Sequence, residues 1–262
     1  MKEDVLNVEN LSYSYVNGVK VLKNVNLKIY EKELVGIIGP NGSGKTTLLK
    51  CIAGVLRNYE GKIQIFKREV KTFNRKEVAK IITFVSQSFS PAFDFTVKEI
   101  VQMGRIPYHK LFQSSIIGDQ KIVDDTILAL DLKGFENRVF NNLSEGEKRR
   151  VVFAKALAQD TSILLLDEPF AHLDINYSYE MARLIQSKVK EYGKTVLGVF
   201  HNLNMASLFC DKIVVMSDGK IIAEGTPEEV YKEDIINRAF KTNCTIISHP
   251  KVSKPQVLIN WS

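Results

Sequence analysis

The residues from 34 to 53 decide the fold, and they read LVGIIGPNGSGKTTLLKCIA. Leu34–Ile38 is short and almost continuously apolar, which predicts a strand buried on both faces, as in a parallel sheet covered by helices. Residues 45–53 repeat apolar side chains at helical spacing and stop before Gly54, which predicts a helix that ends at a glycine cap. A glycine-rich turn therefore joins a buried strand directly to a helix.

This turn, Gly39-Pro40-Asn41-Gly42-Ser43-Gly44-Lys45-Thr46, fits the pattern GxxxxGK[ST]. Its glycines let consecutive backbone N–H groups turn inward without a Cβ clash, so the turn can wrap phosphate groups. The helix N-terminus adds the positive end of its dipole. Lys45 can reach the β- and γ-phosphates of a nucleotide, and the Thr46 hydroxyl can bind Mg²⁺. The segment therefore predicts a nucleotide-binding site.

A second apolar run, Ile163-Leu164-Leu165-Leu166, ends in Asp167 and Glu168. A buried strand that ends in Asp places a carboxylate at the sheet edge where α/β proteins bind ligands. We expect Asp167 to orient a metal ion and Glu168 to polarise an attacking water as a general base. Acidic residues after a strand are usually only solvated, and it is the pairing with the phosphate-binding turn that favours catalysis.

The remaining strand patterns are of two kinds. Residues 22–30 and 61–66 alternate apolar and polar side chains, which predicts half-buried antiparallel strands. Short apolar runs predict further buried strands at 163–166, 195–200 and 213–216. The last of these runs leads through a hairpin turn at Ser217-Asp218-Gly219 to a strand near 221–222.

Helical patterns cover residues 120–131 and 145–159, and the stretch from about 88 to 160 contains no strand pattern. We therefore predict an α/β fold within one domain spanning 1–262. It has a mostly parallel core sheet, an antiparallel β subdomain and an inserted α-helical subdomain at about 88–160.

Composition, charge and cysteine spacing argue against several classes of protein. The chain has 262 residues, of which 45% are hydrophobic and 25% charged, as in ordinary globular domains. It has no apolar run long enough to span a bilayer and no apolar signal core near residue 1, so we expect neither a membrane span nor export. The net charge is +6, but basic and acidic residues are mixed along the chain, so we expect no nucleic-acid partner. The three cysteines lack CxxC spacing and are expected to be reduced thiols.

The segment Leu143-Ser144-Glu145-Gly146-Glu147 has two interpretations. One is a capping box, in which Ser144 caps the following helix and Glu147 reaches back to it. The other is that the same helix N-terminus points its dipole and the Ser144 hydroxyl at a phosphate. Three further residues, Tyr15, Gln87 and His201, are unremarkable one at a time and gain meaning only as part of a set.

Taken together, these three residues and the motifs quoted above follow one another from Tyr15 to His201. In their order and spacing they resemble the nucleotide-binding subunits of ABC transporters, which are P-loop NTPases. Gly39–Thr47 is similar to Walker A and Ile163–Asp167 to Walker B. Residues 143–147 are similar to the signature and 171–174, which include His172, to the D-loop.

The resemblance implies ATP and Mg²⁺ as cofactors and a role for each matching residue. The catalytic set is Glu168, His201 (the switch histidine) and Gln87, and the metal set is Thr46, Gln87 and Asp167. The nucleotide-binding set is Tyr15, which stacks on adenine, with Gly39, Pro40, Asn41, Gly42, Ser43, Gly44, Lys45, Thr46, Thr47, Ser144, Gly146 and Asp174.

The resemblance also implies a head-to-tail homodimer that holds two ATP molecules, with each phosphate-binding turn facing Ser144 and Gly146 of the other chain. One departure is the signature itself, which usually reads LSGGQ. Here Glu145 and Glu147 bring acidic side chains that repel a γ-phosphate unless they turn away, so neither is counted as a ligand.

A narrower resemblance concerns the cargo. Residues 103–108 (MGRIPY) followed by Phe112, the segment His201-Asn202-Leu203-Asn204 and a short C-terminal extension at about 226–262 are similar to ATPases of iron-siderophore, haem and cobalamin importers. This implies a peripheral protein on the cytoplasmic face of the cell membrane that energises import of an iron complex. Its partners would be an integral membrane permease dimer and, indirectly, an extracytoplasmic substrate-binding protein.

Alternative functions remain open. Haem or cobalamin would be carried by the same kind of importer. A soluble ABC-type ATPase acting on nucleic acid or ribosomes usually has two ATPase halves or a long coiled-coil insertion, and this chain shows neither pattern. An exporter ATPase is the third alternative, against which the 104–112 segment and the short C-terminal extension both argue.

Overall fold

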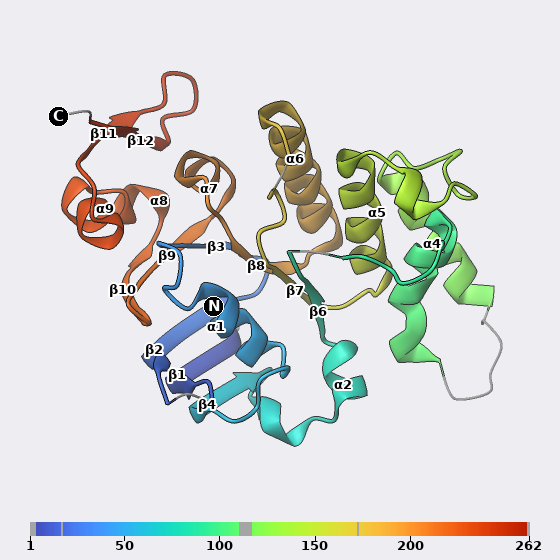
Figure 1. The fold of residues 1–262 in the computed structure, drawn as a ribbon, viewed down its shortest axis with the longest axis horizontal. Helices are drawn as coiled ribbons and strands as arrows, with labels where there is room; N and C mark the ends of the chain where they lie inside the picture. Colours follow the sequence, from blue (N-terminus) through green and yellow to red (C-terminus); the bar gives the residue numbers. More distant parts are fainter. Residues whose placement is uncertain (1–3, 17, 88, 110–116, 172, 261–262) are drawn as a thin grey trace.

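The computed structural model describes residues 4–16, 18–87, 89–109, 117–171 and 173–260 (Figure 1). Phe112 and His172, which the sequence analysis named, lie outside the described residues.

A six-stranded sheet with the order β10-β9-β3-β8-β7-β6 forms the centre of the molecule (Figure 1). Its strands are β3 (Leu34–Ile38), β6 (Ile82–Val85), β7 (Ile163–Leu166), β8 (Thr195–Val199), β9 (Lys212–Ser217) and β10 (Lys220–Gly225). The first five are mutually parallel and β10 is antiparallel. The mostly parallel core sheet and each of its predicted apolar strands are therefore confirmed.

The turn between β9 and β10 is also as predicted. Asp218 and Gly219 have φ angles of 49° and 81°, the left-handed values that a tight two-residue hairpin needs at both positions.

A second, antiparallel sheet has the order β2-β1-β4-β5, with β1 (Asp4–Ser14), β2 (Lys20–Tyr30), β4 (Glu60–Ile65) and β5 (Arg68–Glu69). The predicted strands at 22–30 and 61–66 are confirmed, whereas β1 was not predicted. Irregularities at Asn10, where φ is 50°, shift the register of β1 and break its alternation of side chains. Gly61 faces this point, and a Cβ there would lie 2.4 Å from the Asn10 carbonyl oxygen.

Between β6 and β7 the described residues form helices and turns, with no strand among them. The elements are α3 (Val97–Gln102), the 3₁₀ helix η2 (Met103–Tyr108), α4 (Ile117–Ala129), the 3₁₀ helix η3 (Phe140–Asn142) and α5 (Glu145–Ala158). Both helices predicted in this stretch are present, α5 with its predicted start and α4 shifted toward the N-terminus by about one turn. They lie at one end of the central sheet (Figure 1).

The other helices are α1 (Lys45–Ile52), η1 (Val70–Thr72), α2 (Arg75–Ala79), α6 (Ile175–Tyr192), α7 (Leu203–Phe209), α8 (Pro227–Val230) and α9 (Glu233–Phe240). The chain continues in a small hairpin of β11 (Cys244–Ser248) and β12 (Pro255–Ile259). α1 ends as predicted, because Gly54 follows it with φ of 67°. None of the helices in the described part of the chain is long and apolar enough to cross a membrane.

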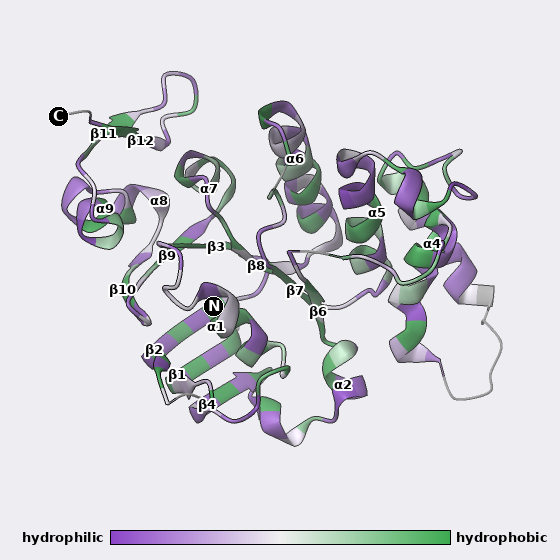
Figure 2. Cartoon of the chain, viewed as in Figure 1, coloured by the Kyte–Doolittle hydropathy of each residue, from purple (hydrophilic) through white to green (hydrophobic). Residues whose placement is uncertain are grey.

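The strands of the central sheet are mostly apolar (Figure 2), and β3, β7 and β8 are buried at every residue. Side chains alternate along β3, so that Val35 and Ile37 pack toward α1 and the antiparallel sheet, whereas Leu34 and Ile38 pack toward α5, α6 and α7. Burial on both faces fixes the strand registers, because a shift of one residue would exchange the two sets. Because β3, β6, β7 and β8 are parallel, their carboxyl ends lie at one edge of the sheet.

The helical region is joined internally by a buried ion pair. Nε of Arg105 on η2 lies 2.8 Å from Oδ1 of Asp119 on α4, and Nη1 of Arg105 donates to the Ala158 carbonyl oxygen at the end of α5. Both charged side chains are about nine-tenths buried. Arg105 therefore links three helical elements.

We expect Arg105→Ala to lower the free energy of unfolding by about 3–5 kcal/mol, because it leaves the Asp119 carboxylate buried with its main partner removed. Lys98→Ala removes an exposed pair with Asp124 in the same region and is expected to cost less than about 1 kcal/mol. Urea unfolding of both variants measures the difference. Equal, small losses would contradict the structural role given to Arg105.

Candidate functional site

The carboxyl ends of four parallel strands surround one cavity of about 380 Å³. The loop after β3, the first turn of α1, and residues following β6, β7 and β8 contribute to its wall. The lining residues are Val21, Asn41, Gly42, Gly44, Lys45, Thr46, Thr47, Gln87, Glu168 and His201. Apart from Val21, all of them were predicted from the sequence as site residues. Val21, one apolar residue in an alternating strand, carried no signal that distinguished it from the core.

The loop Gly39–Gly44 presents backbone rather than side chains. A Cβ on Gly39 would lie 2.1 Å from the Met216 carbonyl oxygen, so the loop can pass over β9 only as glycine. Gly44 precedes α1 in a left-handed conformation and caps it with no side-chain hydrogen bond. The Ser43 hydroxyl is buried in the loop and has no hydrogen-bond partner among the described atoms. The loop thus offers polar groups that an anion could satisfy.

Lys45 points into this loop instead of into solvent. Its Nζ donates to the carbonyl oxygens of Gly39 and Pro40, both at 2.8 Å, and the residue is 5% exposed. Burial lowers the pKa of the ammonium group, while the nearby Glu168 and Asp167 oppose that shift. A cation held here by neutral carbonyls is well placed to attract a negatively charged ligand.

Thr46 and Asp167 meet across the sheet edge. The Thr46 hydroxyl donates to Oδ1 of Asp167 at 2.8 Å, and Asp167 is almost completely buried. Burial raises the pKa of Asp167, the hydrogen bond from Thr46 lowers it, and the Glu168 charge raises it further. Hydroxyl and carboxylate oxygens, with the amide oxygen of Gln87 in the same cavity, are ligand types that Mg²⁺ prefers.

No group of three or more His, Cys, Asp or Glu side chains in the described part of the chain could hold a metal ion by itself. Mg²⁺ is usually bound by one or two carboxylates together with the phosphates of a substrate. The residues present therefore fit a metal that is bound together with a nucleotide.

Glu168 stands between two polar side chains. Oε2 accepts a hydrogen bond from Nε2 of Gln87 at 2.8 Å, and Oε1 lies 2.5 Å from Nε2 of His201. Glu168 has a φ of 52°, a left-handed conformation that is uncommon for a non-glycine residue. Three residues that follow three different strands thus fix one carboxylate at the wall of the cavity.

Tyr15 lies beside the cavity. Its hydroxyl is 3.3 Å from Oγ1 of Thr47, and its ring packs edge-on against Tyr13 with 5.0 Å between the ring centroids. Tyr15 as a whole is 44% exposed, so part of the residue is accessible to a ligand.

Ser144, Gly146 and Asp174 do not line this cavity, and the structure does not bring them together with the loop at 39–44. They lie at the N-termini of α5 and α6, and the residues on either side of Asp174 line a second cavity together with Glu168 and His201. The structure of the single chain therefore brings together some of the predicted site residues and leaves these three outside the cavity.

The capping interpretation of Ser144 is confirmed. Its N–H and its hydroxyl both donate to Oε2 of Glu147, at 2.8 and 2.7 Å. These bonds to Ser144 lower the pKa of Glu147, and Glu145 pairs with Lys148 at 2.9 Å. Both acidic side chains are thus held by groups of their own helix.

Comparison with known proteins places these features in a family. Residues 22–171 match the family model described as ABC transporter. The petrobactin import ATP-binding protein FpuC of Bacillus anthracis is 35% identical over 237 residues, covering 90% of this chain and 86% of FpuC. The hemin import ATP-binding protein HmuV of Thermobifida fusca is 34% identical over 254 residues, covering 97% of this chain and 88% of HmuV.

Two further comparisons concern length and shape. The ABC transporter ATP-binding protein YvrA of Bacillus subtilis is 35% identical over 255 residues, which are 97% of this chain but 58% of YvrA. The dimeric, post-hydrolysis structure of the ATP-binding cassette MJ0796 bound to ADP and Pi superposes with a TM-score of 0.73 at 32% identity. That alignment covers 84% of this chain and 98% of the cassette.

The buried carboxylate of Asp167, beside the cavity, gives a test based on stability. Because burial raises the pKa of Asp167, the folded protein disfavours its ionised form, and Asp167 contributes less stability as the pH rises above its ordinary pKa of about 3.9. Asp167→Asn keeps an acceptor for Thr46 without the charge. We therefore expect the variant to be more stable than the parent at pH 7, with a gain that shrinks toward pH 4.

Urea unfolding at a series of pH values measures this gain. Asp125→Asn, at an exposed carboxylate on α4, is the control and should leave stability unchanged. A loss of stability in Asp167→Asn at pH 7 would show that attraction by Lys50 and Lys45 outweighs burial.

Proposed function

Because this chain belongs to the ABC transporter family, we propose that it is the ATP-binding and ATP-hydrolysing subunit of an importer that works through a separate membrane permease. One observation supports this proposal above the others. The carboxylate of Glu168, held by Gln87 and His201, faces the same cavity as the phosphate-binding loop and Lys45.

In this proposal the loop from Gly39 to Gly44 binds the triphosphate. Its N–H groups and the Ser43 hydroxyl donate to phosphate oxygens, and Lys45 exchanges its carbonyl partners for the β- and γ-phosphates. Pro40, Asn41, Gly42 and Thr47 complete the loop and the first turn of α1, and Tyr15 stacks on the adenine. Thr46, Asp167 and Gln87 would hold Mg²⁺, which neutralises phosphate charge when bound.

The hydrolytic step needs a base near the γ-phosphate. Glu168 accepts a proton from the attacking water, and Gln87 and His201 keep its carboxylate pointed at the cavity. His201 is 47% exposed on its side chain, so it can also turn toward a γ-phosphate. Positioning and electrostatics then supply most of the catalysis, as in other phosphoryl transfers.

A second copy of the chain completes the site. Ser144, Gly146 and Asp174 lie outside the cavity, so a head-to-tail homodimer would bring them to the nucleotide held by the other chain. The similar cassette MJ0796 has been solved as a dimer, which supports this arrangement. Two ATP molecules would then lie between the chains.

The proposed cargo is an iron complex of the siderophore type, since FpuC is a petrobactin import protein by name. The chain would act at the cytoplasmic face of the membrane as a peripheral subunit, with a permease dimer as its direct partner and an extracytoplasmic substrate-binding protein as an indirect one. We treat residues 1–262 as one ATPase domain, with the helical part at about 88–160 and the C-terminal extension at about 226–262.

Haem is the second candidate cargo, because HmuV, a hemin import protein by name, is as similar to this chain as FpuC. Cobalamin is a third, because a relative 33% identical to this chain is a cobalamin import protein by name. A soluble ATPase acting on nucleic acid or ribosomes has less support, because the described residues contain no long coiled-coil insertion.

We expect Glu168→Gln to bind ATP as well as the parent but to hydrolyse it about 10²–10⁴-fold more slowly, because the amide cannot take a proton from water. Steady-state phosphate release and binding of a fluorescent ATP analogue measure the two properties. Glu191→Gln, at an exposed carboxylate near the end of α6, is the matched control and should hydrolyse normally. Normal turnover by Glu168→Gln would exclude Glu168 as the base.

The proposed importer function is tested in cells that lack the gene. Uptake of labelled ferric siderophore should be lost, restored by the parent chain and not restored by Glu168→Gln. Labelled haem and cobalamin, followed in the same cells, distinguish the alternative cargoes. Co-sedimentation of the chain with ribosomes rather than membranes, with all three uptakes unaffected, would favour the soluble ATPase.

A further inference from the structure

Tyr177 stands between two segments that the proposed dimer needs at its interface. It lies in the first turn of α6, where its N–H donates to Oδ1 of Asp174 at 2.9 Å. Its ring lies against the first turn of α5, because a Cβ on Gly146 would be 3.2 Å from Cδ1 and 3.4 Å from Cε1 of the ring. One residue thus contacts Asp174 through its backbone and Gly146 through its side chain.

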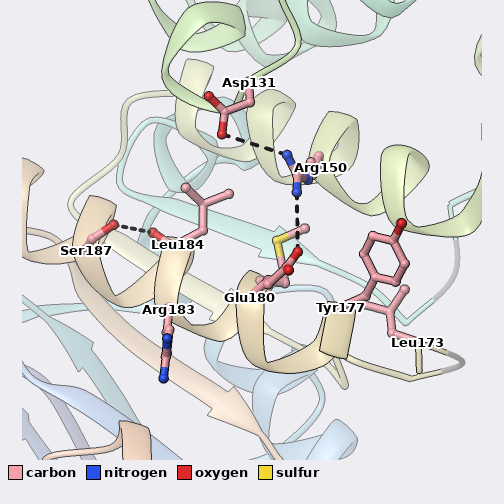
Figure 3. Close-up of a pocket in the computed structure, with 10 residues that line it drawn as sticks. Asp131, Arg150, Leu173, Tyr177, Glu180, Arg183, Leu184 and Ser187 are labelled. Carbon is pink, nitrogen blue, oxygen red and sulfur yellow. Dashed lines mark hydrogen bonds and ion pairs between the residues drawn. The ribbon is translucent and has the colours of Figure 1, made fainter. Parts of the chain in front are cut away.

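The contact between Tyr177 and Gly146 lies at the edge of a cavity. A cavity of about 410 Å³ lies between α5 and α6, lined on one side by Gly146 and Arg150 and on the other by Tyr177 and Glu180. In Figure 3 the ring of Tyr177 points from α6 toward α5, and Arg150 reaches across to Glu180 and Asp131. Those ion pairs are 3.8 Å long and partly exposed, so they constrain the spacing weakly. The rigid ring is the better spacer.

We propose that Tyr177 is a positioning residue that sets the distance between the Ser144–Gly146 end of α5 and the Asp174 end of α6. This inference rests on the proposed dimer. If both ends must meet the second chain at once, an error in their spacing lets only one of them engage. The ring therefore acts on closure of the dimer and leaves nucleotide binding by the single chain unaffected.

A third contact extends the effect toward the catalytic base. Nη2 of Arg149, on α5, donates to the Ala171 carbonyl oxygen in the loop that follows Glu168, at 3.3 Å. The α5 end that would face the nucleotide of the second chain is thus connected to the loop beside the base of its own site. Tyr177 and Arg149 together let these two regions move as one unit.

The test uses Glu168→Gln as the parent, in which ATP should be held without turnover. In that background we expect Tyr177→Ala to raise the apparent dissociation constant of the ATP-driven dimer by about tenfold, the scale of one lost aromatic contact. Binding of a fluorescent ATP analogue by the single chain should not change. Tyr177→Phe should behave as the parent, because the contact is made by ring carbons. Tyr192→Ala, at a similarly exposed tyrosine at the other end of α6, is the control.

Sedimentation velocity with and without ATP separates the outcomes. A Tyr177→Ala chain that dimerises like its parent would overturn the inference, and so would a Tyr177→Phe chain as defective as Tyr177→Ala. A parent that never dimerises would instead refute the proposed dimer itself.

A double-mutant cycle tests the contact independently of dimerisation. Urea unfolding of Gly146→Ala, Tyr177→Ala and the double variant gives the coupling between the two positions. We expect the alanine at 146 to be tolerated better once the ring is removed. An equal effect of Gly146→Ala with and without the ring would show that no such contact exists, and would also overturn the inference.

Discussion

The two-sided burial of the central sheet is the constraint on which the site depends. Alternate side chains of β3 pack into two different cores, so a shift of one residue against β8 or β9 would place each side chain in packing shaped for another. With the registers fixed, Gly39, Gln87, Asp167 and His201 come close together although they are far apart in the sequence. The site therefore forms where these parallel strands end side by side.

The edge of the central sheet at which these strands end also holds several groups in energetically unfavourable environments. Lys45 and Asp167 are charged residues in buried positions, the Ser43 hydroxyl has no partner among the described atoms, and Glu168 has a left-handed backbone. Each of these lowers stability in the free chain, and each has a use once phosphates and a metal are bound. Burial raises the pKa of Asp167 and lowers that of Lys45, so each group would be less perturbed beside a ligand of opposite charge.

Most of the site could be predicted because its chemistry requires specific residue types next to each other in the sequence, as in residues 39–46 and 163–168. The buried strands β3, β7, β8 and β9 were predictable for the same local reason, whereas β6 was not predicted. β1 was missed because irregularities near Asn10 interrupt its alternation. α6 was also not predicted, although its buried residues recur at helical spacing from Ser178 to Val189. The spacing role inferred for Tyr177 had no local signal, because it arises from contact with Gly146, which only the folded chain creates.

The central claim is that one chain holds an incomplete site, so hydrolysis requires two. The most direct test is to measure ATP turnover per chain over a wide range of protein concentrations, with the fraction of dimer measured by sedimentation in the same solutions. Turnover per chain should rise and fall with the fraction of dimer. Full turnover in solutions that contain only single chains would contradict the account.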